Sequence, residues 1–133
     1  MNLFFNVGKG AVSEPRAVVI CYRGNPDSKD IDLAIVGKGV TYDTGGLNIK
    51  TAMMEKMHGD KGGACAVLGA LQGTLELNLK KNIVFACGFA DNAVSAEAMK
   101  PGDILTAMNG LSVEIENTDA EGRLVMSDTM TYV

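Results

Sequence analysis

An apolar run that ends abruptly in glycine and charged residues does most to constrain the fold. Residues 31–36 read Ile-Asp-Leu-Ala-Ile-Val and are wholly apolar from Leu33 onward, as expected of a buried strand. Glycine and charge follow at once, so Lys38 and Asp43 are expected in a loop just past the C-terminal end of the strand. In open α/β sheets, ligands bind at that end of the strands. The sequence therefore predicts an α/β fold with a candidate site at this position.

The other apolar patterns predict further strands and helices around this segment. Residues 62–77 carry apolar side chains at helical spacing and include no proline, which favours a helix. Asn109-Gly110 lies between two short apolar runs and is a strong hairpin signal. The full set of further predicted elements is strands at residues 17–22, 82–90, 104–108 and 112–116, and helices at residues 62–77 and 121–132.

Residues 117–124, Asn-Thr-Asp-Ala-Glu-Gly-Arg-Leu, form a second polar cluster. In an extended segment, residues two apart point to the same side, so Asp119, Glu121 and Arg123 are expected to face one pocket. Carboxylate oxygens suit hard divalent cations, and a guanidinium suits an anion beside them. The alternative is a solvated loop that caps the following helix, because acidic residues in a first turn favour the positive end of the helix dipole.

Together, these segments resemble the leucyl aminopeptidase (cytosol aminopeptidase) family. The resemblance rests on residues 37–46, Gly-Lys-Gly-Val-Thr-Tyr-Asp-Thr-Gly-Gly, then Lys50, then Asp60 before a pair of glycines, and finally residues 117–124. It runs from Asn6 to Tyr132 but covers only the middle part of a typical family member.

This resemblance implies a three-layer α/β/α fold with a mixed sheet, of the zinc-exopeptidase type. It also implies that residues 1–133 are a partial metallopeptidase catalytic domain, without the N-terminal domain and the C-terminal part of the catalytic domain.

The family pattern further implies a pair of divalent metal ions bridged by Asp43 and Glu121. Lys38 and Asp60 would complete the ligands of one ion, and Asp119 those of the other. A lysine binds a cation only as the neutral amine, so Lys38 would need a lowered pKa. Oxygen ligands with one amine suit Zn²⁺ or Mn²⁺, and Mg²⁺ or Co²⁺ are open as well.

The same resemblance implies catalytic and substrate-binding roles. Lys50 would stabilise the developing oxyanion, and Arg123 would hold a bicarbonate ion that carries a proton from water to the leaving amine. Met57 matches a position that lines the pocket for the substrate's first side chain, although a methionine in this Met-rich stretch also suits core packing. The step from Lys50 to Asp60 is one residue shorter than in the family, which either leaves Asp60 in place or displaces it.

The charge balance and the cysteines limit which other classes of protein this chain can belong to. Twelve basic residues against sixteen acidic ones give a net charge of −4 without any basic run, which disfavours nucleic-acid binding. No segment has the length of a transmembrane helix, and the apolar start is too short for a secretory signal. Cys21, Cys65 and Cys87 are odd in number and lie in apolar surroundings, which predicts buried free thiols in a reducing compartment. These features predict a cytoplasmic protein that does not bind membranes.

The resemblance therefore predicts a two-metal aminopeptidase that hydrolyses N-terminal residues, preferably leucine, from peptides. Complete family members form hexamers, which implies a homo-oligomer. The isolated chain is expected to have little or no activity, because missing strands would expose sheet edges and apolar faces. Two alternatives stay open: a non-catalytic partial relative that acts as a structural or assembly subunit, and another two-metal hydrolase such as a phosphatase.

Overall fold

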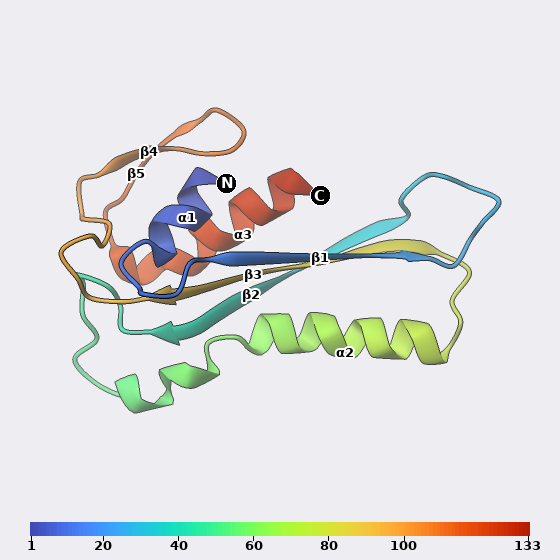
Figure 1. Ribbon diagram of the computed structural model, residues 1–133, viewed down its shortest axis with the longest axis horizontal. Helices are drawn as coiled ribbons and strands as arrows, with labels where there is room; N and C mark the ends of the chain where they lie inside the picture. The colour runs from blue at the N-terminus through green and yellow to red at the C-terminus, as the bar shows by residue number, and fades with distance from the viewer.

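The computed structural model describes residues 1–133 and has a three-layer α/β/α architecture (Figure 1). Its main elements are α1 (Asn2–Gly8), β1 (Arg16–Arg23), β2 (Leu33–Asp43), α2 (Gly62–Glu76), β3 (Asn82–Asn92) and α3 (Glu121–Tyr132). The strands form one sheet in the order β1-β3-β2, in which β3 pairs antiparallel with β1 and parallel with β2. Helix α2 covers one face, and α1 and α3 pack together on the other. The predicted α/β fold with a mixed sheet is confirmed.

The central strand β3 supplies apolar side chains to both layers. Phe85 and Cys87 pack toward α2 in a cluster of five buried residues, whereas Ala90 belongs to a cluster of nine on the α1 and α3 side. Full burial of a side chain such as Phe85 contributes about 1.5–3 kcal/mol. The first cluster consists of Ala64, Val67, Ile83, Phe85 and Cys87, and the second of Leu3, Phe4, Val7, Val40, Ala90, Met99, Ile115, Leu124 and Val125. The sheet is therefore held from both faces, and its strand ends are fixed in place.

Strand β2 is longer than predicted. The sequence indicated an end at residue 36, but β2 stays paired with β3 as far as Asp43 opposite Asn92. Lys38 and Asp43 therefore lie on the strand itself, and their predicted placement in a loop is wrong. Glycine at 37 ends the apolar pattern without ending the pairing: a Cβ on Gly37 would lie 2.6 Å from a backbone oxygen of α2, so glycine is needed for close packing between strand and helix.

Most other predicted elements are confirmed with small differences in length. α2, α3 and β1 begin and end within one residue of the prediction, and β3 extends two residues further. The hairpin is present as β4 (Ile104–Thr106) paired antiparallel with β5 (Ser112–Glu114). Its strands are shorter than predicted because the turn is wider: Ala107 N donates to Leu111 O at 2.8 Å, and Gly110 takes φ +88 between them.

Helix α1 was not predicted, and a distant residue explains why it forms. Asp128, on α3, accepts hydrogen bonds through Oδ2 from Leu3 N at 2.8 Å and Phe4 N at 3.3 Å. The same carboxylate accepts from Met108 N through Oδ1 at 2.8 Å. The first N–H groups of a helix lack partners within the helix, so Asp128 supplies the cap that the local sequence does not.

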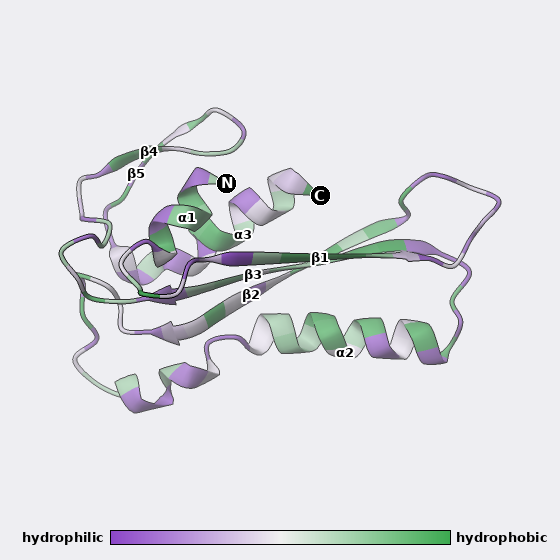
Figure 2. Cartoon of the chain, viewed as in Figure 1, coloured by the Kyte–Doolittle hydropathy of each residue, from purple (hydrophilic) through white to green (hydrophobic).

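The surface differs from the prediction in its cysteines. Cys87 is buried as expected, but Cys21 on the edge strand β1 and Cys65 on α2 are exposed, so that part of the prediction is wrong. Figure 2 shows apolar residues along the strands and along α2, where Leu68 and Leu75 remain exposed. No helix combines the length and the apolar character that a membrane crossing requires.

Candidate metal centre

The site is built around Asp43, the last residue of β2. Its side chain is buried, and its Oδ1 accepts hydrogen bonds from Asn92 Nδ2 at 2.8 Å and Gly45 N at 3.0 Å. Gly45 has φ +88 and begins the turn that leads toward Lys50. Burial acts to raise the pKa of Asp43, but Lys50, Asn92 and the Gly45 amide outweigh burial, and the pKa is lowered. Asp43 is therefore a fixed carboxylate at the carboxyl end of a strand.

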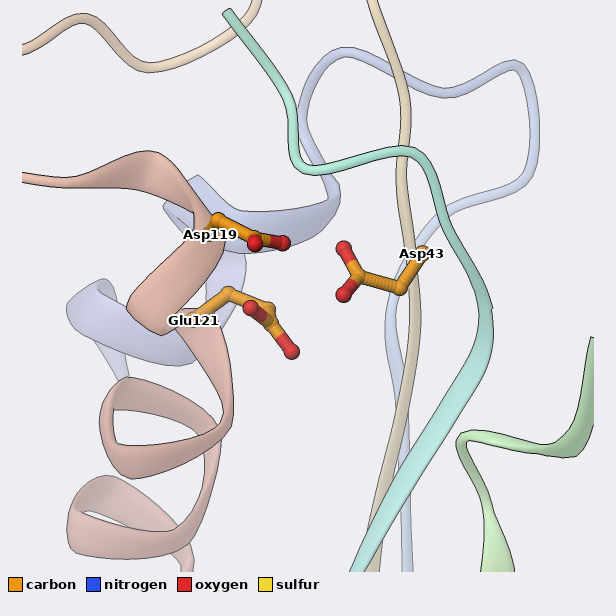
Figure 3. A group of neighbouring side chains, drawn as sticks. All are labelled: Asp43, Asp119 and Glu121. Carbon is orange, nitrogen blue, oxygen red and sulfur yellow. The ribbon is translucent and has the colours of Figure 1, made fainter. Parts of the chain in front are cut away.

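Asp119 and Glu121 approach Asp43 from the other side of the site. The short 3₁₀ helix η2 (Thr118–Ala120) leads directly into α3, so the segment is helical, and the predicted extended conformation is wrong. Asn117 causes the difference, because its side chain accepts from Asp119 N at 2.8 Å and starts the turn. Ligand atoms of Asp43, Asp119 and Glu121 still lie within 4.8 Å of one another, and Figure 3 shows the three carboxylates facing a common space.

The solvated-loop alternative fits only part of this segment. Asn117 does cap a turn, as that alternative expected, but Glu121 has only 1% of its surface exposed. Burial raises the pKa of Glu121, and the nearby charge of Asp43 raises it further. Lys38 lowers this pKa, but the net shift is upward. A carboxylate held in this way is costly unless a cation faces it.

Lys38 joins Glu121 to Asp60. Its Nζ lies 2.7 Å from Glu121 Oε1 and 2.8 Å from Asp60 Oδ2. Both oxygens are shielded from solvent, and neither has a hydrogen-bond partner beyond this charge contact. Burial acts to lower the pKa of Lys38, but the two carboxylates outweigh it and the pKa is raised. Asp60 therefore reaches the site despite the shortened step that precedes it.

Lys50 makes the second pair of charge contacts. Its Nζ lies 2.9 Å from Asp43 Oδ2 and 2.5 Å from Asp119 Oδ1. Burial acts to lower the pKa of Lys50, but hydrogen bonds and charge attraction from these two carboxylates raise it strongly. Lys50 therefore carries a permanent positive charge at the edge of the acidic group.

Two predicted residues lie outside this group. Arg123 is exposed, has no carboxylate within 4.0 Å, and lines a hollow of about 300 Å³ together with Lys38 and Glu121. Met57 is partly buried and lies in the 3₁₀ helix η1 (Met54–Gly59), which Asp60 directly follows. Arg123 thus borders the acidic group, while Met57 belongs to the element that delivers Asp60.

The donor set fits divalent cations. Four carboxylates face two ammonium groups, which leaves an excess of negative charge in a largely buried space. Asp60 Oδ2 and Glu121 Oε1 also retain unused acceptor capacity. Hard divalent ions prefer carboxylate oxygens, and an amine can join them once it has lost its proton. Asp43, Asp119 and Glu121 would hold such an ion as a group, with Lys38 and Asp60 beside them.

Two supporting residues were not predicted from the sequence. Asn92 donates through Nδ2 to Asp43 Oδ1 and also to Thr118 O at 3.0 Å. Thr118 is fully buried and donates through Oγ1 to Gly45 O at 2.6 Å. They join the β2 turn to the start of α3. The only signal in the sequence was that a polar residue follows each apolar run. This signal does not reveal that Asn92 and Thr118 are in contact.

The fold and the site together define a class: an α/β domain with an acidic site of metal-binding type at the carboxyl ends of its parallel strands. The family model described as the cytosol aminopeptidase family, catalytic domain, matches residues 1–133. The chain therefore belongs to the cytosol aminopeptidase family.

Individual relatives agree with this assignment. The probable cytosol aminopeptidase of Clostridium perfringens is 47% identical over 133 residues, and that of Pseudomonas fluorescens strain Pf0-1 is 48% identical over the same length. The solved structure of Caenorhabditis elegans leucine aminopeptidase superposes with a TM-score of 0.92 at 40% identity and covers 98% of this chain. The chain spans about 27% of the length of each of these proteins.

Proposed function

We propose that this chain carries the metal-binding part of an aminopeptidase that releases N-terminal residues, leucine best, from peptides. The observation that carries the proposal is the convergence of Asp43, Asp119 and Glu121 on one space, with Lys38 and Lys50 in contact with them. Family membership supplies the reaction class, and the name of the structural relative supplies the leucine preference.

In this proposal Asp43 and Glu121 would be ligands shared by two divalent ions, Lys38 and Asp60 would be further ligands of one ion, and Asp119 would be a further ligand of the other. Zn²⁺ and Mn²⁺ suit the donors best, and Mg²⁺ or Co²⁺ remain compatible. When bound, such a pair of ions lowers the pKa of a shared water and polarises the scissile carbonyl. Asn92 supports the arrangement, because its hydrogen bond to Asp43 fixes the orientation of a bridging carboxylate.

The chain's own cations perform the remaining steps. Lys50 keeps its proton, because its pKa is raised, and so offers a fixed positive charge to an oxyanion that forms beside Asp43 and Asp119. Arg123 is exposed beside the site without a carboxylate partner, so its guanidinium is free to hold an anion such as bicarbonate. That anion would carry a proton to the leaving amine.

Substrate binding and assembly belong to the same proposal. Met57 contributes to the pocket for the first side chain of a peptide substrate, which suits a preference for leucine. The complete protein would act in the cytoplasm as a hexamer. The word cytosol in the name of its relatives supports the location. Residues 1–133 would be the central part of its catalytic domain, between an N-terminal domain and the C-terminal part of the catalytic domain.

A non-catalytic role as a structural or assembly subunit is the second candidate. The observation that favours it is the set of exposed apolar side chains on α2, such as Leu68 and Leu75, which would suit packing against another protein surface. In that case the acidic group would have no reason to bind metal tightly.

Calorimetric titration of the purified chain with Mn²⁺ and with Zn²⁺ tests the proposal. We expect two ions bound by the wild type and none by Asp43→Ala or Glu121→Ala. Hydrolysis of leucine amide should be slow or absent in the isolated chain, and phosphoesters should not react at all. A folded chain that binds neither metal would refute the proposal in favour of the structural role, and phosphoester turnover would favour another two-metal hydrolase.

A further inference from the structure

The side chain of Lys38 crosses the surface of Gly122 on its way into the acidic group. A Cβ added to Gly122 would lie 2.8 Å from Lys38 Cδ, 2.8 Å from Cε and 2.9 Å from Nζ. Carbon atoms in real proteins essentially never approach this closely, so the present path of Lys38 requires the absence of a side chain at position 122. Gly122 is buried in the first turn of α3, directly after Glu121.

We propose that Gly122 is a positioning residue for Lys38: by having no side chain, it keeps open the path along which the amine reaches Glu121 and Asp60. The inference deepens the proposed function, on which its metal-binding consequence rests. Its geometric part does not depend on metal, because the contacts at 2.7 Å and 2.8 Å from Lys38 Nζ to the two carboxylates are contacts within the chain.

A comparison with other glycines shows why Gly122 acts on the site and not on the fold. A Cβ on Gly63 would meet the backbone of β2, at 2.8 Å from Lys38 N, and a Cβ on Gly37 would meet Gly63 O at 2.6 Å. Backbone cannot move aside cheaply, so these two glycines are needed for the packing of α2 on the sheet. At Gly122 the three closest atoms all belong to the flexible end of one side chain.

The surroundings give a displaced Lys38 somewhere to go. A hollow of about 300 Å³ opens beside Gly122 and is lined by Lys38, Glu121, Arg123 and Met126. The backbone of Gly122 does not have positive φ, and alanine is a better helix former than glycine. Gly122→Ala should therefore still fold while moving the Lys38 amine away from Glu121, because the gain in helix propensity offsets part of the cost of leaving the buried Glu121 carboxylate without its cation.

The first test needs no metal. Purified wild-type chain, Gly122→Ala and the control Gly73→Ala are treated with acetic anhydride in EDTA, and the rate of acetylation at each lysine is followed by mass spectrometry. Gly73 lies within α2 with open space around its Cβ position, so it matches the change in helix propensity without touching the site. We expect Lys38 to react several-fold faster in Gly122→Ala only, while Lys50 keeps its rate in all three proteins. Unchanged Lys38 reactivity in folded Gly122→Ala would overturn the inference.

The second test measures the consequence for metal. Mn²⁺ titrations of wild type, Gly122→Ala, Lys38→Met and the double variant form a double-mutant cycle. We expect Gly122→Ala to lower the affinity for one of the two ions about tenfold, a size typical of changes that misplace a ligand. In the Lys38→Met background, Gly122→Ala should have no further effect on affinity. Equal weakening in both backgrounds would count against the inference. A wild type that binds no metal would refute the proposed function alone, because the acetylation result would still decide whether Gly122 positions Lys38.

Discussion

The amide of Asn92 donates to Asp43 Oδ1 at 2.8 Å, and through this bond β3 fixes the carboxylate at the end of β2. The same nitrogen donates to Thr118 O at 3.0 Å, so one side chain joins the strand to the turn that carries Asp119. Both Asn92 and Asp43 are 2% exposed, which means that water cannot replace either bond. Asn92 thus holds together the two halves of the acidic group.

Replacing Asn92 by alanine should therefore weaken both the fold and the site. Asp43 Oδ1 would keep only the hydrogen bond from Gly45 N, and the buried Thr118 O would lose the bond from Asn92, at a cost of about 1–3 kcal/mol for a group left unsatisfied. Urea denaturation followed by circular dichroism would measure the loss. Asn109→Ala, in the exposed hairpin turn, is the control, because it removes only a solvent-exposed acceptor for Leu111 N and should cost clearly less than Asn92→Ala. Equal stability of the two variants would contradict this account of Asn92.

Asp128 should be the most sensitive polar residue outside the site. It is 1% exposed and accepts from the amides of Leu3, Phe4 and Met108, so Asp128→Ala leaves three backbone donors without a partner. We expect a loss of about 3 kcal/mol in the free energy of unfolding, since hydrogen bonds to a charged group are the strong ones. Hydrogen exchange at the amides of α1 should rise with it. Thr131→Ala, on the exposed side of α3, serves as the control. Normal protection of α1 in Asp128→Ala would show that the helix does not need this cap.

These two residues also show where prediction from the sequence ends. Hydrophobic periodicity identified β1, α2, β3 and α3, because each buries a face whose pattern is local. It could not identify α1, whose cap lies on α3, at a sequence distance of 125 residues from Leu3. It also ended β2 too early, since the continued pairing of β2 depends on β3 and on close packing against α2, neither of which is visible in the apolar pattern.

The candidate site shows the same division. The grouping of Asp43, Asp119 and Glu121 followed from their residue types and the family resemblance, and the structure brings the three together. The backbone conformation that brings them together differs from the predicted one, because Asn117 starts a helical turn where an extended segment was expected. The support from Asn92 was not predicted at all, since a single asparagine after an apolar strand has no pattern of its own.

Stability should depend on pH through Asp32, far from the acidic group. Lys81 lowers the pKa of the Asp32 carboxyl below its ordinary value of 3.8, and the backbone amide of Asn82, which donates to it at 2.8 Å, lowers it further. A lowered folded-state pKa stabilises the protein above pH 3.8, and this stability is lost as the pH falls through the folded-state value.

Asp32→Asn should therefore be less stable than the wild type at neutral pH, and the difference should shrink toward zero in acid. Thermal denaturation at a series of pH values would measure it. Asp27→Asn is the control, because the Asp27 carboxylate is exposed and makes no hydrogen bond or ion pair. A difference that stayed constant from neutral to acid pH would show that the ionised carboxylate of Asp32 is not what matters.

Metal stoichiometry should separate the roles of the carboxylates. Asp43 and Glu121 are the buried members of the acidic group and are the proposed shared ligands, whereas Asp119 is partly exposed and is assigned to one ion. On this geometry Asp119→Asn should lose one of two Mn²⁺ ions and keep the other, while Asp43→Ala should lose both. Glu116→Gln removes an exposed charge near the site and should keep both ions, which controls for the change in net charge. Calorimetry with parallel measurement of bound metal would give the stoichiometry. If Asp119→Asn lost both ions, or Asp43→Ala retained both, the bridging role would belong to a different carboxylate, and the assignment of Asp43 as the shared ligand would be wrong.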